Sequence, residues 1–269
     1  MSFTTPPRPF DVAAVFPQLA PLARTATRLH PRPGSPTVHD SSVGGPLLWP
    51  ADEPWPHCEG PHEKGATSVV LSPDDVRVLR RNRAAITSRR HLGRPASLPT
   101  PEELATSKRI RQGRPRPEGP IPLLPVAQLY ARDVPLPGSP PDADLLQVLW
   151  CPFDHPTHPR TALFWRAAAK VTDVLADPPE PTAIQLPSYL PEPCVLSPEQ
   201  VTEYPHPMEL SEDLQRQLAD VSVWETAGPA WNPAYAIAPH EFYRNQLAYA
   251  PGWKVGGWSS WGLTDPQPR

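Results

Sequence analysis

Two short segments of the chain place a cysteine and a histidine at the same spacing. The first is Cys58-Glu-Gly-Pro-His62, and the second is Cys151-Pro-Phe-Asp-His155. Thiolate sulfur and imidazole nitrogen are preferred zinc ligands, and two of each form a common tetrahedral set. The proline in each segment stiffens the backbone that carries the ligands. We therefore predict that these four residues bind zinc if the fold brings the two segments together.

The same residues allow two other interpretations. With one coordination position left open, the set would serve a metal-dependent enzyme rather than a structural site. Without a metal, Cys151 would be a small hydrophobic residue at the end of a buried strand, and the histidines would lie in surface loops. His57 and His158 are spare candidates for the ligand set.

A second candidate site lies in two segments that share the pattern Val-Gly-Gly-x-x-x-Trp. They are Val43 to Trp49 and Val255 to Trp261. This echo predicts an internal duplication with one glycine doublet in each half. If the two loops meet, their rings and backbone would line one cleft for a ligand or a partner protein. The alternative is that the tryptophans build the core and the doublets form tight turns. The residues predicted to line the cleft are Gly44, Gly45, Trp49, Trp55, Gly256, Gly257, Trp258 and Trp261.

Sequence motifs of common enzyme classes are absent. The chain has no Gly-x-Ser-x-Gly nucleophile motif, no phosphate-binding Gly-x-x-x-x-Gly-Lys and no dinucleotide-binding Gly-x-Gly-x-x-Gly. We therefore name no catalytic residue.

Hydrophobic periodicity and helix start signals outline the elements that must position these residues. Ser-Pro-Asp-Asp at 72–75 and Thr-Pro-Glu-Glu at 100–103 are typical helix starts, and Ser211 caps the clearest amphipathic pattern. The expected helices cover 11–16, 72–90, 100–113 and 211–223, with a helical turn at 197–199. The expected strands or extended segments cover 24–33, 121–130, 144–153, 161–168, 171–175 and 182–187.

Charge is distributed unevenly along the chain. The segment 77–116 holds 12 basic and two acidic residues, whereas the whole chain carries a net charge of −3. One interpretation is a solvated excursion that lies against the acidic remainder. The other is a patch for nucleic acid, although the segment has no aromatic ring with which to stack bases.

Composition indicates a globular protein with long irregular connections. Proline accounts for 44 of 269 residues, but nine tryptophans supply apolar area that disordered chains lack. Three cysteines are too few for a secreted disulfide framework. With no signal-type segment and no long apolar run, we predict a cytoplasmic location and no membrane partner.

Four motifs in order resemble the YwqG-like bacterial family, whose function is uncharacterised. They are the Val-Gly-Gly-Pro segment with its tryptophans at 43–56, Val-Ala-Gln-Leu at 126–129, Asp-Leu-Leu-Gln-Val-Leu-Trp at 144–150, and Val-Gly-Gly-Trp-Ser-Ser-Trp at 255–261. The resemblance implies an α+β fold with mainly antiparallel sheets in two internally related halves, connected by many proline-rich loops. It carries over no catalytic residue.

The resemblance also implies a domain organisation. An irregular segment 1–40 precedes a single domain, 41–269. The first half of this domain is 41–170, including a helical basic insertion at 61–120, and the second half is 171–269. Relatives continue past the second Gly-Gly motif with a further strand, so the second half is expected to be truncated at its C-terminal end.

These observations predict a non-catalytic module that binds a small-molecule ligand or another protein. One alternative is a zinc-containing protein or metal-dependent enzyme that uses the Cys/His residues. A second is nucleic-acid association through the arginine-rich insertion.

Overall fold

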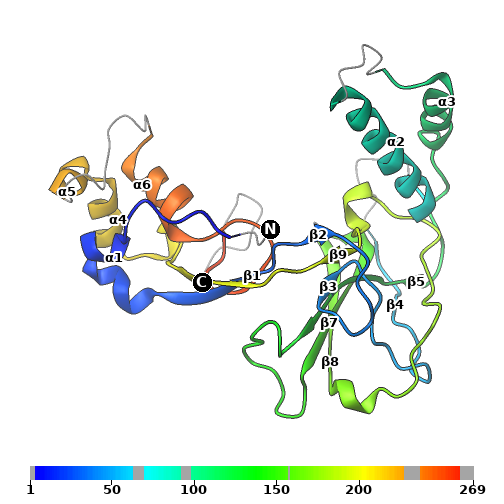
Figure 1. Cartoon of the computed structure of the whole chain (residues 1–269), viewed down its shortest axis with the longest axis horizontal. Coiled ribbons are helices and arrows are strands. Elements are labelled where there is room, and N and C mark those ends of the chain that lie inside the picture. The colour runs from blue at the N-terminus through cyan, green and yellow to red at the C-terminus, as the bar shows by residue number, and fades with distance from the viewer. Residues whose placement is uncertain (1–3, 63–69, 92–97, 157, 227–236, 261–269) are drawn as a thin grey trace. The chain divides into compact units, whose positions relative to one another are not determined.

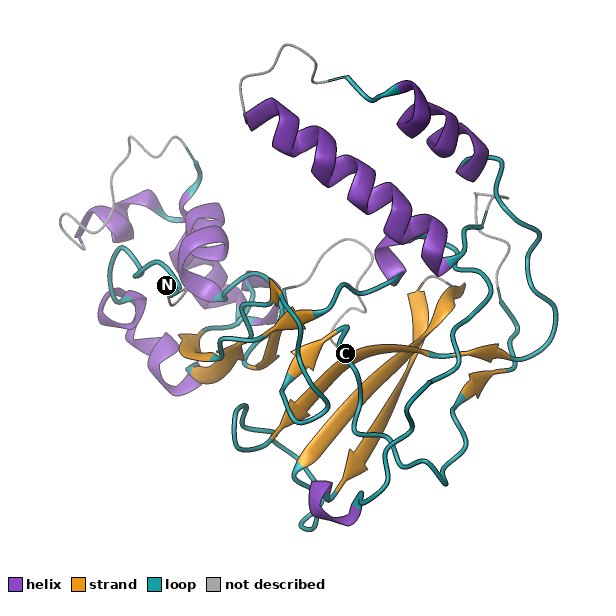
Figure 2. Cartoon of the chain, turned by 45° about the vertical axis from the view of Figure 1, so that its right-hand side comes forward, coloured by secondary structure: helices purple, strands orange, loops and turns teal. Residues whose placement is uncertain are grey.

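The computed structural model describes residues 4–62, 70–91, 98–156, 158–226 and 237–260. The chain divides into two compact units (Figure 1). Unit 1 comprises Met1–Arg32, Ala131–Gly138 and Leu196–Arg269, and unit 2 comprises Pro33–Tyr130 and Ser139–Val195. Each unit contains helices and an antiparallel sheet, which confirms the predicted α+β class (Figure 2). None of the helices in the described residues is long and apolar enough to cross a bilayer.

Unit 2 is built on a six-stranded sheet with the order β2-β9-β3-β6-β7-β8. Its long strands β6, β7 and β8 are antiparallel neighbours, and a two-residue connection joins β7 to β8. A separate pair, β4 and β5, is also antiparallel. The strands are β2 (Arg32–Pro33), β3 (Ser42–Val43), β4 (His57–Cys58), β5 (Ile121–Pro122), β6 (Leu124–Tyr130), β7 (Leu145–His155), β8 (His158–Arg166) and β9 (Cys194–Val195).

Two helices of unit 2, α2 (Pro73–His91) and α3 (Pro101–Ile110), lie side by side at one end of that unit (Figure 1). The Ser72 hydroxyl accepts a hydrogen bond from the Asp75 amide at 3.1 Å, and Thr100 with Glu103 forms a capping box. Both predicted helices are therefore confirmed, and their start signals are the ones that the sequence indicates. Short 3₁₀ segments, η2 (Ala168–Lys170) and η3 (Pro187–Tyr189), complete unit 2.

Unit 1 packs helices against a three-stranded antiparallel sheet with the order β10-β1-β11. Its core includes Phe16, Leu218, Trp224 and Tyr243, all fully buried. The elements are α1 (Val12–Val15), η1 (Pro17–Leu22), β1 (Arg24–Arg28), β10 (Glu199–Glu203), η4 (Pro207–Glu209), α4 (Glu212–Ala219), α5 (Val221–Thr226), α6 (Pro239–Phe242), the π-helix η7 (Tyr243–Ala248) and β11 (Lys254–Gly256).

Several sequence predictions need correction. The segment 1–40 is not irregular, because it contributes α1, η1 and β1 to unit 1. Residues 197–199 do not form a helical turn, because Glu199 begins strand β10, which pairs with β1. The helix expected at 211–223 is interrupted at Asp220, whose carboxylate accepts the Ser222 amide and starts α5. Residues 171–175 form no strand and contribute only a bridge between Val174 and Pro50.

The expected internal duplication is not confirmed. One unit has a three-stranded sheet and the other a six-stranded sheet with a different strand order. Both units are assembled from separate stretches of chain, so the predicted halves, 41–170 and 171–269, do not coincide with them.

Candidate metal centre

The two Cys-x3-His segments meet inside unit 2. One ligand atom from each of four side chains lies within 4.8 Å of all the others. The Cys58 sulfur is 3.4 Å from His155 Nε2, and the rings of His62 and His155 are edge to face with centroids 4.7 Å apart. We call this group the Cys2His2 cluster; its members are Cys58, His62, Cys151 and His155.

The first two ligands come from strand β4 and the turn that follows it. Cys58 pairs with Ile121 in the β4–β5 ladder, and its side chain is buried in the core of unit 2. Gly60 then adopts a φ of +94°, a left-handed conformation that favours glycine. This turn reverses the chain within four residues, so that His62 lies beside the cysteine that precedes it.

The other two ligands come from β7, and a strand irregularity brings them together. In a regular strand, Cα atoms four residues apart are about 13 Å from each other, too far for Cys151 and His155 to share an ion. The β7–β8 register shifts between Trp150 and Asp154, so that a step of four residues on β7 faces a step of two on β8. This bulge shortens the separation, and the two ligand atoms converge.

Burial governs the electrostatics of the cluster. Cys151 is fully buried, and burial raises the pKa of its thiol to about 12, with nearby Cys58 contributing in the same direction. Burial is also the main cause of a lowered pKa at His62 and at His155, and the cation of Arg160 lowers both further. Both imidazoles are therefore neutral at neutral pH, which is their metal-binding form.

Neighbouring polar side chains hold the bulge in place. Gln185 donates its backbone amide to the Pro152 carbonyl at 2.9 Å, and its side-chain oxygen accepts the Asp154 amide at 3.2 Å. The Asp154 carboxylate in turn accepts hydrogen bonds from the side-chain amide of Gln185 and from the Tyr189 hydroxyl. Because these bonds engage both carboxylate oxygens, Asp154 is a support for the strand rather than a free base beside the cluster.

Two ring nitrogens of the cluster are buried without a hydrogen-bond partner in the described part of the chain. They are Nε2 of His62 and Nδ1 of His155. Buried polar atoms normally have partners, so His62 Nε2 is a candidate ligand atom, whereas in His155 the atom that lies with the other ligands is Nε2, 3.4 Å from the Cys58 sulfur. The spare candidates lie outside the cluster: His57 donates from Nδ1 to the Trp55 carbonyl at 2.7 Å, and His158 is exposed at the start of β8.

The first glycine doublet is shaped by close backbone packing. Gly44 has a φ of +62°, and a Cβ there would lie 2.6 Å from the Glu192 carbonyl oxygen. A Cβ on Gly45 would lie 2.6 Å from the Ser42 hydroxyl. The doublet also lines a cavity of about 540 Å³ with Arg80 of α2 and several prolines.

The tryptophans next to this doublet belong to the core, which is the alternative that the sequence left open. Trp49 is 1% exposed and Trp55 7% exposed, and their ring centroids are 5.0 Å apart. The indole nitrogen of Trp55 donates to the Leu123 carbonyl at 2.9 Å. These two rings therefore stabilise the interior of unit 2 and do not line a surface.

The second glycine doublet, in unit 1, encloses a buried ion pair. Glu203 is fully buried, and its carboxylate accepts Lys254 Nζ at 2.7 Å and the amide of Trp258 at 2.9 Å. A Cβ on Gly257 would lie 2.2 Å from that carboxylate, whereas Gly256 mainly supplies the left-handed turn, with a φ of +74°. The motif thus supplies a backbone amide and the Lys254 ammonium to the Glu203 carboxylate. The Val-Gly-Gly-x-x-x-Trp spacing did not predict this role.

Of the two remaining tryptophans of the predicted cleft, the structure describes only Trp258. Trp258 is half-buried, donates to the Leu22 carbonyl at 2.9 Å and lies under the guanidinium of Arg24. Trp261 lies outside the described residues. The two doublets belong to different units, so the shared cleft stays a prediction.

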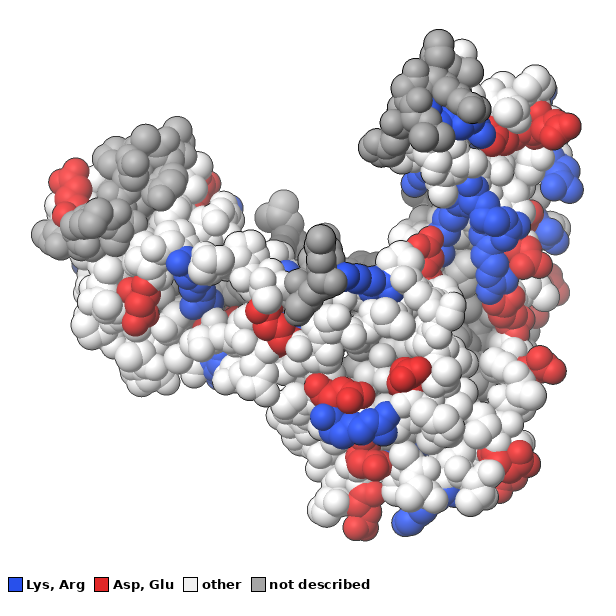
Figure 3. Space-filling model, in the orientation of Figure 1, with Lys and Arg blue, Asp and Glu red and all other residues white. Residues whose placement is uncertain are grey.

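Four arginines of the basic segment form ion pairs with acidic side chains. Arg77 pairs with Asp74 and Glu180, and Arg80 pairs with Glu192. Two further ion pairs join Arg89 to Glu103 and Arg114 to Asp75. Figure 3 shows positive and negative side chains interspersed over this part of unit 2. Such pairing is typical of the solvated excursion, and nucleic-acid association stays a prediction.

Comparisons with known proteins add no relative to this description. No protein-family model matches the chain, and no curated protein matches it. The resemblance to the YwqG-like family therefore remains a prediction from the sequence.

Proposed function

We propose that this protein is a non-catalytic zinc protein in which the Cys2His2 cluster holds one structural Zn²⁺. The observation that carries the proposal is the convergence of the four ligand atoms within 4.8 Å. They come from two segments that are about 90 residues apart in the chain. Both segments have the same Cys-x3-His spacing, and the fold brings both to one point. A single ion bound by all four side chains accounts for both observations.

The chemistry of the donor set favours zinc. Zinc–sulfur bonds of about 2.3 Å and zinc–nitrogen bonds of about 2.0 Å, in tetrahedral geometry, place ligand atoms about 3.3–3.8 Å apart. The 3.4 Å between the Cys58 sulfur and His155 Nε2 falls in this range. Two thiolates also neutralise the charge of Zn²⁺, so the bound centre is electrically neutral in its buried site.

The number of protein ligands favours a structural role over a catalytic one. A catalytic zinc usually has three protein ligands and leaves the fourth position to water or substrate, whereas four protein ligands close the coordination shell. The adjacent carboxylate, Asp154, is occupied by Gln185 and Tyr189 and is not aimed at a fourth-position water. This arrangement supports the zinc-containing alternative and argues against a metal-dependent enzyme.

The role of the ion follows from the elements that it joins. Cys58 belongs to the β4–β5 pair, and Cys151 belongs to the six-stranded sheet. Zinc would therefore fix the smaller sheet, and the turn that carries His62, to strand β7 of the larger sheet.

Metal analysis of the purified protein tests the proposal. We expect one zinc per chain in the wild type, and less than a tenth of that in Cys58→Ser and Cys151→Ser. Cys194→Ser is the matched control, because Cys194 is a free, partly buried cysteine of the same unit outside the cluster. A folded wild-type protein that takes up no zinc, or equal zinc in Cys58→Ser and Cys194→Ser, would overturn it.

A further inference from the structure

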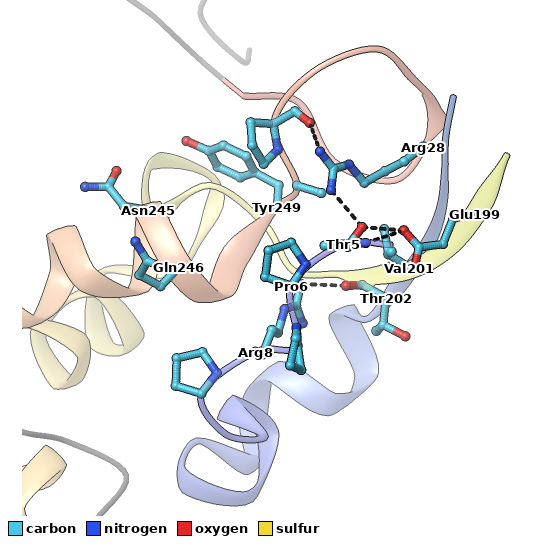
Figure 4. A pocket seen from close by; sticks show the side chains of 14 residues that line it. Thr5, Pro6, Arg8, Arg28, Glu199, Val201, Thr202, Asn245, Gln246 and Tyr249 are labelled. Atoms are coloured by element: carbon cyan, nitrogen blue, oxygen red, sulfur yellow. Dashed lines mark hydrogen bonds between the residues drawn. The ribbon is translucent and has the colours of Figure 1, made fainter. Parts of the chain in front are cut away.

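A cavity in unit 1 has features that the zinc proposal does not use. Its volume is about 460 Å³, which is within the range of small-molecule sites. Figure 4 shows the cavity between the extended segment 5–9, strands β1 and β10, and the end of the π-helix η7. All these elements belong to unit 1, so the cavity is a property of that unit alone.

Two arginines line this cavity without a carboxylate partner. Arg8 donates to the carbonyls of Thr202 and Ala248, and Arg28 donates to the Thr5 hydroxyl and the Pro251 carbonyl (Figure 4). Within the described part of the chain neither forms an ion pair, although both are half-buried. A guanidinium has five N–H donors, so both keep donors for a ligand.

The acidic side chain that lines the cavity, Glu199, is ionised and offsets only one of the two guanidinium charges, and its hydrogen bonds are made to other groups. Glu199 accepts hydrogen bonds from the amide and hydroxyl of Thr5 and lies 2.9 Å from His30 Nε2. No ion pair joins it to Arg28 among the described residues. The two arginines therefore leave an excess of positive charge at the cavity, and a half-buried charge of this kind is stabilised by an anion.

The rest of the wall is flat and apolar. Pro6, Pro7 and Pro251 face the space together with Val201 and the ring of Tyr249. Tyr249 follows η7, and π-helical turns are uncommon in proteins and often occur at functional sites. Asn245 and Gln246 place side-chain amides at the rim (Figure 4).

From these features we propose that the cavity binds a small organic carboxylate with a planar apolar body. Arg28 and Arg8 would hold the carboxylate through paired N–H donors, because the fork of a guanidinium matches the two oxygens of that group. The planar part would lie against the prolines and the Tyr249 ring. The amides of Asn245 and Gln246 would contact polar substituents at the rim.

Binding of three small probes to the full-length protein, measured by calorimetry or ligand-observed NMR, tests this site. The probes are benzoate, its neutral counterpart benzamide, and inorganic phosphate. We expect benzoate to bind at least about tenfold more tightly than either of the others, because only benzoate offers both the carboxylate and the ring. No binding of benzoate at millimolar concentration, or equal binding of benzamide or phosphate, would overturn the proposal.

Substitutions then locate the binding to this cavity. We expect Arg28→Met to weaken benzoate binding by about 10- to 100-fold and Tyr249→Leu by about threefold to tenfold. Arg216→Met is the matched control, since Arg216 lies on α4 of the same unit, 78% exposed and away from the cavity. Circular dichroism verifies that each variant is folded. If Arg28→Met fails to fold, Tyr249→Leu and Arg28→Lys replace it. Unchanged benzoate affinity in the folded cavity variants would refute the assignment.

Discussion

Removing the metal from unit 2 gives the most informative perturbation of stability. The cluster joins Cys58 to Cys151 and closes a loop of about 93 residues. In the chain-entropy model, a cross-link that closes a loop of this length stabilises the folded state by about 4–5 kcal/mol. For a unit of this size, about 1 kcal/mol shifts the melting temperature by about 2–4 °C. We therefore expect a strong chelator to lower the Tm of the wild-type protein by roughly 8–20 °C.

Combining the chelator with cysteine variants separates the metal from the side chain itself. Wild type and Cys194→Ser should both lose Tm when chelator is added, whereas Cys58→Ser should start low and respond no further. Circular dichroism follows the transition, and hydrogen exchange with mass spectrometry should show protection lost in β4 and β7 but kept in β1 of unit 1. A chelator shift below about 2 °C in the wild type would refute the structural role. A shift of equal size in Cys58→Ser would do the same.

Three further predictions concern unit 1. Gly257→Ala should lower the free energy of unfolding in urea by about 2–4 kcal/mol, because the methyl meets the Glu203 carboxylate at 2.2 Å and φ is +72°. Gly138→Ala has a similar φ of +80° in open space, so equal losses in the two variants would contradict the clash. Lys254→Met leaves the buried Glu203 carboxylate unpaired and should cost about 3–5 kcal/mol in the same assay, whereas a loss below about 1 kcal/mol would contradict the ion pair. Hydrogen bonds to the Glu199 carboxylate lower its pKa from 4.5 to about 2, so its ionised form stabilises the fold above about pH 4.5, and this contribution is lost as the pH falls toward 2. Glu199→Gln should flatten the pH dependence of Tm between those values, and an unchanged slope would contradict this assignment.

The elements of unit 2 were largely predictable because local signals and long-range packing agree there. The alternating pattern that begins at Leu145 forms β7, and the Ser72 and Thr100 caps start α2 and α3. In unit 1 the Ser211 cap starts α4 as predicted, but another start signal is wrong. Ser-Pro-Glu at 197–199 is typical of a helix start, yet pairing with β1 places Glu199 in a strand, because sheet hydrogen bonds outweigh a single capping preference.

The candidate site was predictable in its chemistry and not in its geometry. The repeated Cys-x3-His spacing singled out Cys58 and Cys151 with their histidines, and the fold brings all four side chains together. The bulge in β7 that allows this depends on the bonds that Gln185 makes to Pro152 and Asp154, and no sequence pattern marks Gln185 for that role.

The glycine doublets show how a motif and its role can diverge. Their shared spacing suggested two copies of one binding loop. In the structure Gly44 makes room for a backbone carbonyl, whereas Gly257 makes room for the buried Glu203 carboxylate. Both positions need glycine because another chain segment approaches closely. The sequence cannot reveal which segment approaches, because Glu192 is far from Gly44 along the chain and Glu203 is far from Gly257.

X-ray absorption at the zinc edge of the metal-loaded protein tests the central claim most directly. The account predicts a four-coordinate ion with two sulfur neighbours at about 2.3 Å and two imidazole nitrogens at about 2.0–2.1 Å. Cys151→Ser, which should hold less than a tenth of the zinc, should lose the zinc–sulfur signal, whereas both sulfur neighbours should remain in Cys194→Ser. A zinc shell made only of oxygen and nitrogen, or a spectrum unchanged by Cys151→Ser, would contradict the Cys2His2 centre.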